Sequence, residues 1–207
     1  MSPEARRSQE DRSTSTRLAL MRATIDCLVE YGYAGTTTRL VADRAQVSRG
    51  AQTHHFPTKR DLVAAAIEHL FDEHAREFAA AFEQVPAEDR TLDRAVDALW
   101  RIVSGPSYAA VLEVVVAART DDELRVIVHA TAAGLERTVV ELLLWFSPEI
   151  SDEAVARRIV DIAFTVVQGA AVSSYGGFGD PDAVIEFIKS ISGLATHLPG
   201  IAPAEGS

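Results

Sequence analysis

Apolar residues recur at three- and four-residue spacings along most of this 207-residue sequence, and no segment alternates apolar and polar residues as a half-buried strand does. This spacing is typical of helices that bury one face. We therefore expect an all-α protein. The first helix is expected over residues 15–31 and ends at Gly32, and residues 1–13 ahead of it are expected to form a polar, flexible tail.

Beyond residue 57 the same spacing predicts six longer helices, separated by proline, glycine and serine. They span residues 59–84, 92–103, 106–119, 121–146, 151–175 and 180–198, and residues 200–207 are expected to form a second flexible tail. The helix over residues 151–175 starts polar, with Asp152 and Glu153, and then becomes apolar nearly all round from Ile159 to Val172. A helix of this kind is buried on every face, so one face is expected to cover the protein's own core and another a second copy of the chain.

Between these two parts, residues 36–57 predict two short helices joined by a tight turn. Thr37 is a good N-cap for the first short helix, and Ser48 is a good N-cap for the second. Pro57 ends the second helix and favours an extended conformation at Phe56. Two helices joined in this way form a helix-turn-helix, whose second helix can lie in the major groove of DNA.

The side chains of the second short helix suit base and phosphate recognition. Arg49 can bridge guanine O6 and N7, Gln52 can pair with adenine N6 and N7, and Thr53 offers a hydroxyl and a methyl group. Gly50 allows a close approach to the phosphate backbone. Lys59 adds a positive charge in the first turn of the next helix, which Thr58 and Asp61 begin as a capping box.

The segment from Gly32 to Leu62 resembles the DNA-binding motif of the TetR family of transcriptional regulators. The matching positions are Gly32, Thr36, Thr37, Arg39, Val41, Ala42, Ala45, Val47, Ser48, Gly50, His55, Phe56, Thr58, Lys59 and Leu62. Three positions depart from the family's pattern. Gln46 stands where the family has a turn glycine, Thr53 replaces a tyrosine that contacts phosphate, and Leu40 replaces an acidic capping residue.

The resemblance implies a three-helix DNA-binding head over residues 14–57 and a helical effector-binding and dimerisation body over residues 58–199. It implies a homodimeric repressor that is released from a palindromic double-stranded DNA operator by a small, mostly apolar effector. Together with the side-chain chemistry, it predicts DNA contacts from Thr37, Thr38, Arg39, Ser48, Arg49, Gly50, Gln52, Thr53, His54, His55 and Lys59.

Two further sets of residues follow by analogy with the family. The candidate liners of an effector pocket are Trp100, Tyr108, Leu112, Val116, His129, Phe164 and Gln168. For each of them, simple core packing remains an alternative. The candidate dimer interface consists of Ile159, Ile162, Val166, Gly169, Ala170, Ser173, Val184, Phe187, Ile188 and Ile191.

The net charge of −10 argues against nucleic acid until its distribution is considered. Residues 1–60 hold ten Lys and Arg against six Asp and Glu, whereas residues 61–207 hold ten against twenty-four. The positive part of the chain therefore coincides with the predicted helix-turn-helix. DNA repels an acidic body, which leaves the basic segment to face the duplex.

Other features narrow the class of protein. No apolar run reaches the roughly 18 residues of a membrane span, the N-terminal segment is charged, and the single cysteine, Cys27, allows no intramolecular disulfide. We therefore expect a cytoplasmic protein that does not bind a membrane. Because the sequence has no phosphate-binding glycine loop, zinc-ligand spacing or nucleophile elbow, we expect no enzymatic activity, no cofactor and no metal site.

Several alternatives stay open at this point. In one, the helix-turn-helix residues are only a corner of a helical bundle, and in another, the last two helices fill the core of a monomer. A small-molecule-binding or scaffold protein with a vestigial DNA-binding head would show no salt-dependent binding to a duplex. A helical enzyme would turn over a ligand, although no motif names its chemistry.

Overall fold

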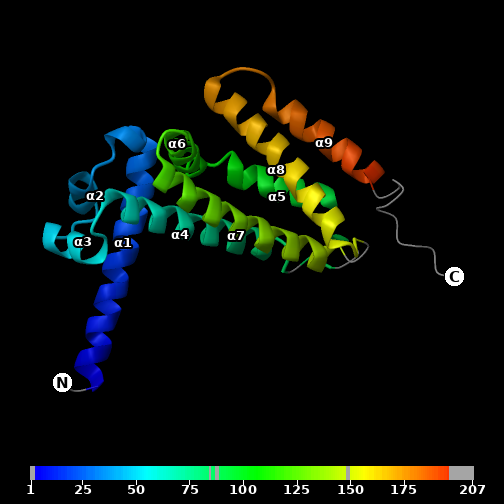
Figure 1. Ribbon diagram of the computed structural model, residues 1–207. Helices are drawn as coiled ribbons and strands as arrows, with labels where there is room; N and C mark the ends of the chain where they lie inside the picture. The colour runs from blue at the N-terminus through cyan, green and yellow to red at the C-terminus, as the bar shows by residue number, and fades with distance from the viewer. Residues whose placement is uncertain (1–2, 84, 87–88, 148–149, 196–207) are drawn as a thin grey trace. The chain divides into compact units, whose positions relative to one another are not determined.

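In the computed structural model, the described residues are 3–83, 85–86, 89–147 and 150–195, and every regular element among them is a helix (Figure 1). This confirms the all-α class. The helices are α1 (Pro3–Gly35), α2 (Thr38–Arg44), α3 (Arg49–His55), α4 (Lys59–Ala80), α5 (Leu92–Val103), α6 (Tyr108–Ala118), α7 (Asp122–Phe146), α8 (Glu153–Gly176) and α9 (Pro181–Ala195). The predicted tail at residues 200–207 lies outside the described residues.

Helix α1 begins at Pro3, so the expectation that the first helix starts near residue 15 is wrong. The segment ahead of residue 15 lacks an apolar face, but after Pro3 it contains no proline or glycine, and a helix extends easily once its first turn exists. The predicted end at Gly32 is confirmed, because Gly32 has the non-helical angles φ 67° and ψ 177°. One further helical turn then leads to Gly35.

The chain forms two compact units, which do not coincide with the predicted functional domains. The first unit holds residues 1–71 and 106–131, and the second holds residues 72–105 and 132–207. Helix α6 and the start of α7 therefore group with the helix-turn-helix segment, although the functional boundary is predicted at residues 57 and 58. Helices α4 and α7 each continue from one unit into the other.

In the first unit, α1 packs against α2, α3 and α6 (Figure 1). The buried core at the helix-turn-helix is formed by apolar residues of α1, α2 and α4 together with Phe56 after α3. Its members are Leu20, Ala23, Cys27, Val41, Phe56, Leu62 and Ala65. This core holds the two short helices on a long one, which seven-residue helices need because they are marginal in isolation.

In the second unit, α5 packs against α8 and α9, and α8 packs against α9. The Tyr175 hydroxyl of α8 donates to the carbonyl of Gly105, just after α5, at 2.7 Å, and Lys189 Nζ of α9 lies 3.0 Å from the Asp97 carboxylate of α5. Among the described residues, no single helix has the length and apolar composition of a membrane span, and α5 and α6 meet that test only when they are counted together across a bend.

Candidate nucleic-acid interface

Helices α2 and α3 are capped as their sequence predicts. The Thr37 hydroxyl accepts a hydrogen bond from the Leu40 N–H at 3.2 Å, and the Ser48 hydroxyl accepts one from the Ala51 N–H at 3.1 Å. Both cap residues are extended, which directs the chain into each helix. The two predicted N-caps are therefore confirmed.

The turn between the two helices depends on Gln46. Its φ is 56°, and it is the one non-glycine residue in the described part of the chain with a positive φ. The Val47 N–H then donates to the carbonyl of Ala42 at 3.0 Å, which closes the end of α2. A glycine would adopt this conformation without steric cost, so Gln46 introduces local strain that the rest of the head must outweigh.

Most of the residues that are predicted to contact DNA are exposed to solvent. Among the predicted residues on or beside α2 and α3, the exposed ones are Thr37, Arg39, Ser48, Arg49, Gly50, Thr53 and His54. Thr38, His55 and Lys59 are half-buried. The exposed residues of α3 thus include a guanidinium, a hydroxyl and an imidazole, which are the groups that donate to bases and phosphates.

Gln52 does not fit the expectation that it reads a base. Its side chain is 2% exposed, and its amide Nε2 donates to the carbonyl of Phe56 at 2.7 Å. The residue lies on the side of α3 that is turned away from solvent. Gln52 is therefore removed from the set of base contacts.

Gly50 has no packing reason to be glycine. A Cβ built at this position would meet nothing closer than the Ser48 Oγ at 3.9 Å among the described atoms. Glycine within a helix is also less favourable than alanine by about 1 kcal/mol. A DNA backbone lying close to residue 50 would explain why this position has glycine although the protein has room for a side chain. This agrees with the predicted approach to a phosphate backbone.

Lys59 is engaged inside the protein. Its ammonium donates to the carbonyl of Tyr33 and lies 4.1 Å from the centre of the Tyr33 ring. Burial lowers the pKa of this ammonium below its ordinary value. Lys59 thus fastens the end of α1 to the start of α4, and only the donors that remain on its ammonium are available to a phosphate.

The two neighbouring histidines differ in their surroundings. His54 is exposed, whereas His55 is half-buried, and their ring centroids lie 5.4 Å apart. The pKa of His55 is lowered, mainly by burial and further by the nearby His54 and Arg17. A neutral His55 can contact a phosphate only through a single ring N–H.

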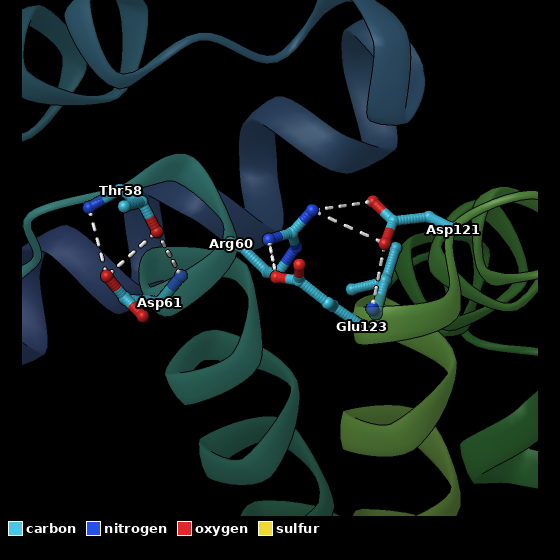
Figure 2. A network of polar contacts seen from close by, with 6 residues as sticks. Thr58, Arg60, Asp61, Asp121 and Glu123 are labelled. Carbon is cyan, nitrogen blue, oxygen red and sulfur yellow. Dashed lines mark hydrogen bonds and ion pairs between the residues drawn. The ribbon is translucent and has the colours of Figure 1, made fainter.

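The first turn of α4 carries contacts that link distant parts of the sequence (Figure 2). The predicted capping box is confirmed, because the Thr58 N–H donates to the Asp61 carboxylate at 3.0 Å and the Asp61 N–H donates to the Thr58 hydroxyl at 3.1 Å. Figure 2 shows the Arg60 guanidinium facing the carboxylates of Asp121 and Glu123. Arg60 Nη2 lies 3.2 Å from Asp121 Oδ2, and Arg60 Nη1 pairs with the Glu123 carboxylate.

Asp121 has a second role at the start of α7. Its carboxylate accepts a hydrogen bond from the Leu124 N–H at 3.0 Å. This hydrogen bond, together with Arg60, lowers the pKa of Asp121. The cap and the ion pair therefore join the first turns of α4 and α7. Arg60 and Asp121 had no local signal in the sequence, because they are 61 residues apart and only the tertiary fold brings them together.

The predicted pocket residues are divided between the two compact units. Tyr108, Leu112, Val116 and His129 belong to the first, and Trp100, Phe164 and Gln168 belong to the second. Tyr108 is buried, whereas Val116 and His129 are exposed. The pocket remains a prediction.

Many of the predicted dimer-interface residues are exposed apolar residues on α8 and α9. Ile162 is 66% exposed and Phe187 is 65% exposed, and Val184 and Ile191 are also exposed. Ala170 differs from them, because it is only 4% exposed and packs in the core of its own unit. We therefore remove Ala170 from the candidate dimer interface. The remaining residues are Ile159, Val166, Gly169, Ser173 and Ile188, of which Gly169 is exposed and the others are half-buried.

Comparisons with known proteins agree with this arrangement. A family model described as "Bacterial regulatory proteins, tetR family" matches residues 20–66. The HTH-type transcriptional regulator CymR of Pseudomonas putida is 34% identical over 177 residues, which cover 84% of this chain and 86% of CymR. An uncharacterized HTH-type transcriptional regulator of Mycobacterium tuberculosis is 32% identical over 202 residues, covering 92% of this chain and 97% of the relative.

Solved structures with the same fold include a putative TetR-family transcriptional regulator from Rhodococcus sp., with a TM-score of 0.74, 19% identity and coverage of 87% of this chain and 98% of that chain. The multidrug binding protein EbrR, complexed with imidazole, has a TM-score of 0.63 at 21% identity and covers 92% of this chain and 97% of that chain.

Proposed function

The chain belongs to the TetR family of bacterial transcriptional regulators, and we propose that it acts as a homodimeric repressor released from a palindromic operator by a small, mostly apolar effector. The observation that carries the DNA-binding part is the outer face of α3. There the Ser48-capped helix exposes Arg49, Thr53 and His54 beside a glycine that internal packing does not require.

The contacts divide into two kinds. Arg49 makes the base contact, because its guanidinium can bridge guanine O6 and N7 in the major groove. Phosphates are held by the exposed or half-buried polar groups around it, which position the head without reading sequence. These are Thr37, Thr38, Arg39, Thr53, His54, His55 and, through its remaining donors, Lys59.

Dimerisation follows from the apolar surface of α8 and α9. Ile162, Val184, Phe187 and Ile191 are exposed in a single chain, and a Cβ added at Gly169 would meet nothing within 4 Å. A second copy covers this surface and brings two heads to half-sites about 34–36 Å apart.

The effector acts through α4. This helix begins directly after the DNA-binding head, so a shift of α4 changes the spacing of the two heads and their match to the operator. A small, mostly apolar effector is the class of ligand that we infer from membership of the family. Repression accords with release by an effector, since the unliganded dimer is then the form that occupies DNA.

The experiment compares wild type and Arg49→Ala on duplexes taken from the DNA that flanks the protein's own gene, and on a random duplex. Fluorescence anisotropy at two salt concentrations gives both affinities. Arg49→Ala is expected to lose roughly 5- to 150-fold on the specific duplex and to relax the preference at one base pair. Equal losses on specific and random DNA would contradict the base contact. Absence of salt-dependent binding by wild type would favour a vestigial head.

A further inference from the structure

Gln52 joins the last turn of α3 to the residue that follows it. The Gln52 Nε2 donates to the carbonyl of Phe56 at 2.7 Å, and the Phe56 N–H donates to the backbone carbonyl of Gln52 at 2.8 Å. The side chain is 2% exposed, so its amide lies away from water. A buried amide that loses its partner is costly, which makes this pair of hydrogen bonds a strong local constraint.

Phe56 is itself held firmly. It has left the helix with the extended angles φ −139° and ψ 96°, and Pro57 follows it. Its ring is 2% exposed within the core of the head, and the Arg17 guanidinium of α1 lies 4.8 Å from the ring centre. Gln52 therefore ties α3 to a point that α1 and the core hold in place.

The buried position of Gln52 defines where the other side chains of α3 lie around its axis. Consecutive residues of a helix lie about 100° apart around its axis, so Gly50 and His54 are each about 160° from Gln52. Arg49 is about 60° away and Thr53 about 100° away. All four of these residues are exposed, whereas Gln52 is buried.

We propose that Gln52 is a positioning residue for sequence recognition: its buried amide, bound to the Phe56 carbonyl, sets the rotation of α3 and so aims Arg49, Thr53 and His54 at their bases and phosphates. The inference rests on the proposed function, in which α3 enters the major groove. It differs from direct reading, because Gln52 touches no base and acts on several positions of the half-site at once.

The test uses the 207-residue chain and the specific duplex, in which each base pair of one half-site is replaced in turn. Gln52→Met keeps the length of the side chain and removes the amide donor. Val126→Met, at a 69% exposed position on α7, introduces a methionine outside the DNA-binding head and is the control. Gln52→Met is expected to lose roughly tenfold in the ratio of specific to random affinity. That loss is expected to spread over several adjacent base pairs, while the salt dependence of random binding stays as in wild type and in the control.

Two outcomes overturn the proposal. Loss of preference at a single A·T pair means that Gln52 reads a base directly. A lower melting temperature with an unchanged ratio of specific to random affinity means that Gln52 only packs. Wild-type binding in the same assay tests the proposed function separately, and the proposal falls with that function if wild type ignores every duplex.

A second measurement does not depend on the folding of a variant. In ¹⁵N-labelled wild type, the Gln52 side-chain amide protons are expected to exchange slowly with solvent, both in the free protein and when the specific duplex is bound. Rapid exchange in the free protein, or contacts from this amide to a base in the complex, would overturn the proposal.

Discussion

Glu113 of α6 accepts a hydrogen bond from the backbone N–H of Tyr33 at 2.9 Å, across 80 residues of sequence. The same carboxylate occupies the space beside Gly32, where an added Cβ would lie 2.7 Å from Glu113 Oε2. Gly32 also has a backbone conformation, φ 67° and ψ 177°, that is essentially restricted to glycine. The end of α1 therefore requires both the absence of a side chain at residue 32 and the carboxylate of α6.

Gly32→Ala is expected to lower the free energy of unfolding by about 1–3 kcal/mol, because alanine at residue 32 is strained and displaces Glu113. Urea unfolding followed by circular dichroism measures the change. Gly134→Ala is the matched control: a Cβ at this helical position meets nothing within 4 Å. The control is expected to gain roughly 0.5–1 kcal/mol. A loss of similar size in both variants would contradict the account of Gly32.

Gly50→Ala is expected to raise the stability of the protein and to weaken its binding to DNA. The added methyl group has space within the protein and favours the helix, so the free energy of unfolding is expected to rise by up to about 1 kcal/mol. The same methyl group obstructs the approach of a phosphate backbone, so affinity for all duplexes is expected to fall. Thermal unfolding and fluorescence anisotropy measure the two effects. Unchanged affinity beside increased stability would remove Gly50 from the interface.

Phe187→Asp is expected to convert the proposed dimer to a monomer, because Phe187 is 65% exposed on the proposed interface and a carboxylate there would be buried without a partner. Analytical ultracentrifugation gives the mass. Val126→Asp, at a 69% exposed position on α7, introduces the same charge outside the proposed interface and is expected to stay dimeric. If the Phe187 variant keeps the wild-type mass, the interface lies elsewhere.

Acidification is expected to destabilise the protein through His74, which is 9% exposed and whose pKa is lowered by burial. The unfolded chain then binds a proton more readily than the native one, so the stabilising contribution is complete above the unfolded pKa of about 6.5 and is lost as the pH falls below it. The loss is up to about 1.4 kcal/mol for each pH unit in that window. His55, with its pKa also lowered, adds in the same direction.

Melting temperatures at pH 7.5 and pH 5.5 measure this dependence. His74→Gln removes the titrating group and is expected to reduce the difference between the two temperatures. An equal difference in wild type and in the variant would mean that other groups control the pH response.

Local sequence was sufficient to predict the helix-turn-helix. Thr37 and Ser48 each bind a backbone N–H three residues ahead, and Thr58 and Asp61 are also three residues apart. Such caps form within a single turn of chain, so their residue types are enough to predict them. The end of the first helix at Gly32 was predictable for the same reason, although its start at Pro3 was not.

The tertiary structure alone decided how these elements are turned and joined. Helix α3 has seven residues with polar groups on every side, so its sequence contains no apolar stripe to indicate which residue faces inward. In the folded protein Gln52 is buried, whereas Arg49 and Thr53 are exposed. The contacts of Arg60 with Asp121 and of Tyr33 with Glu113 span 61 and 80 residues, and pairs so far apart become neighbours only when the helices pack.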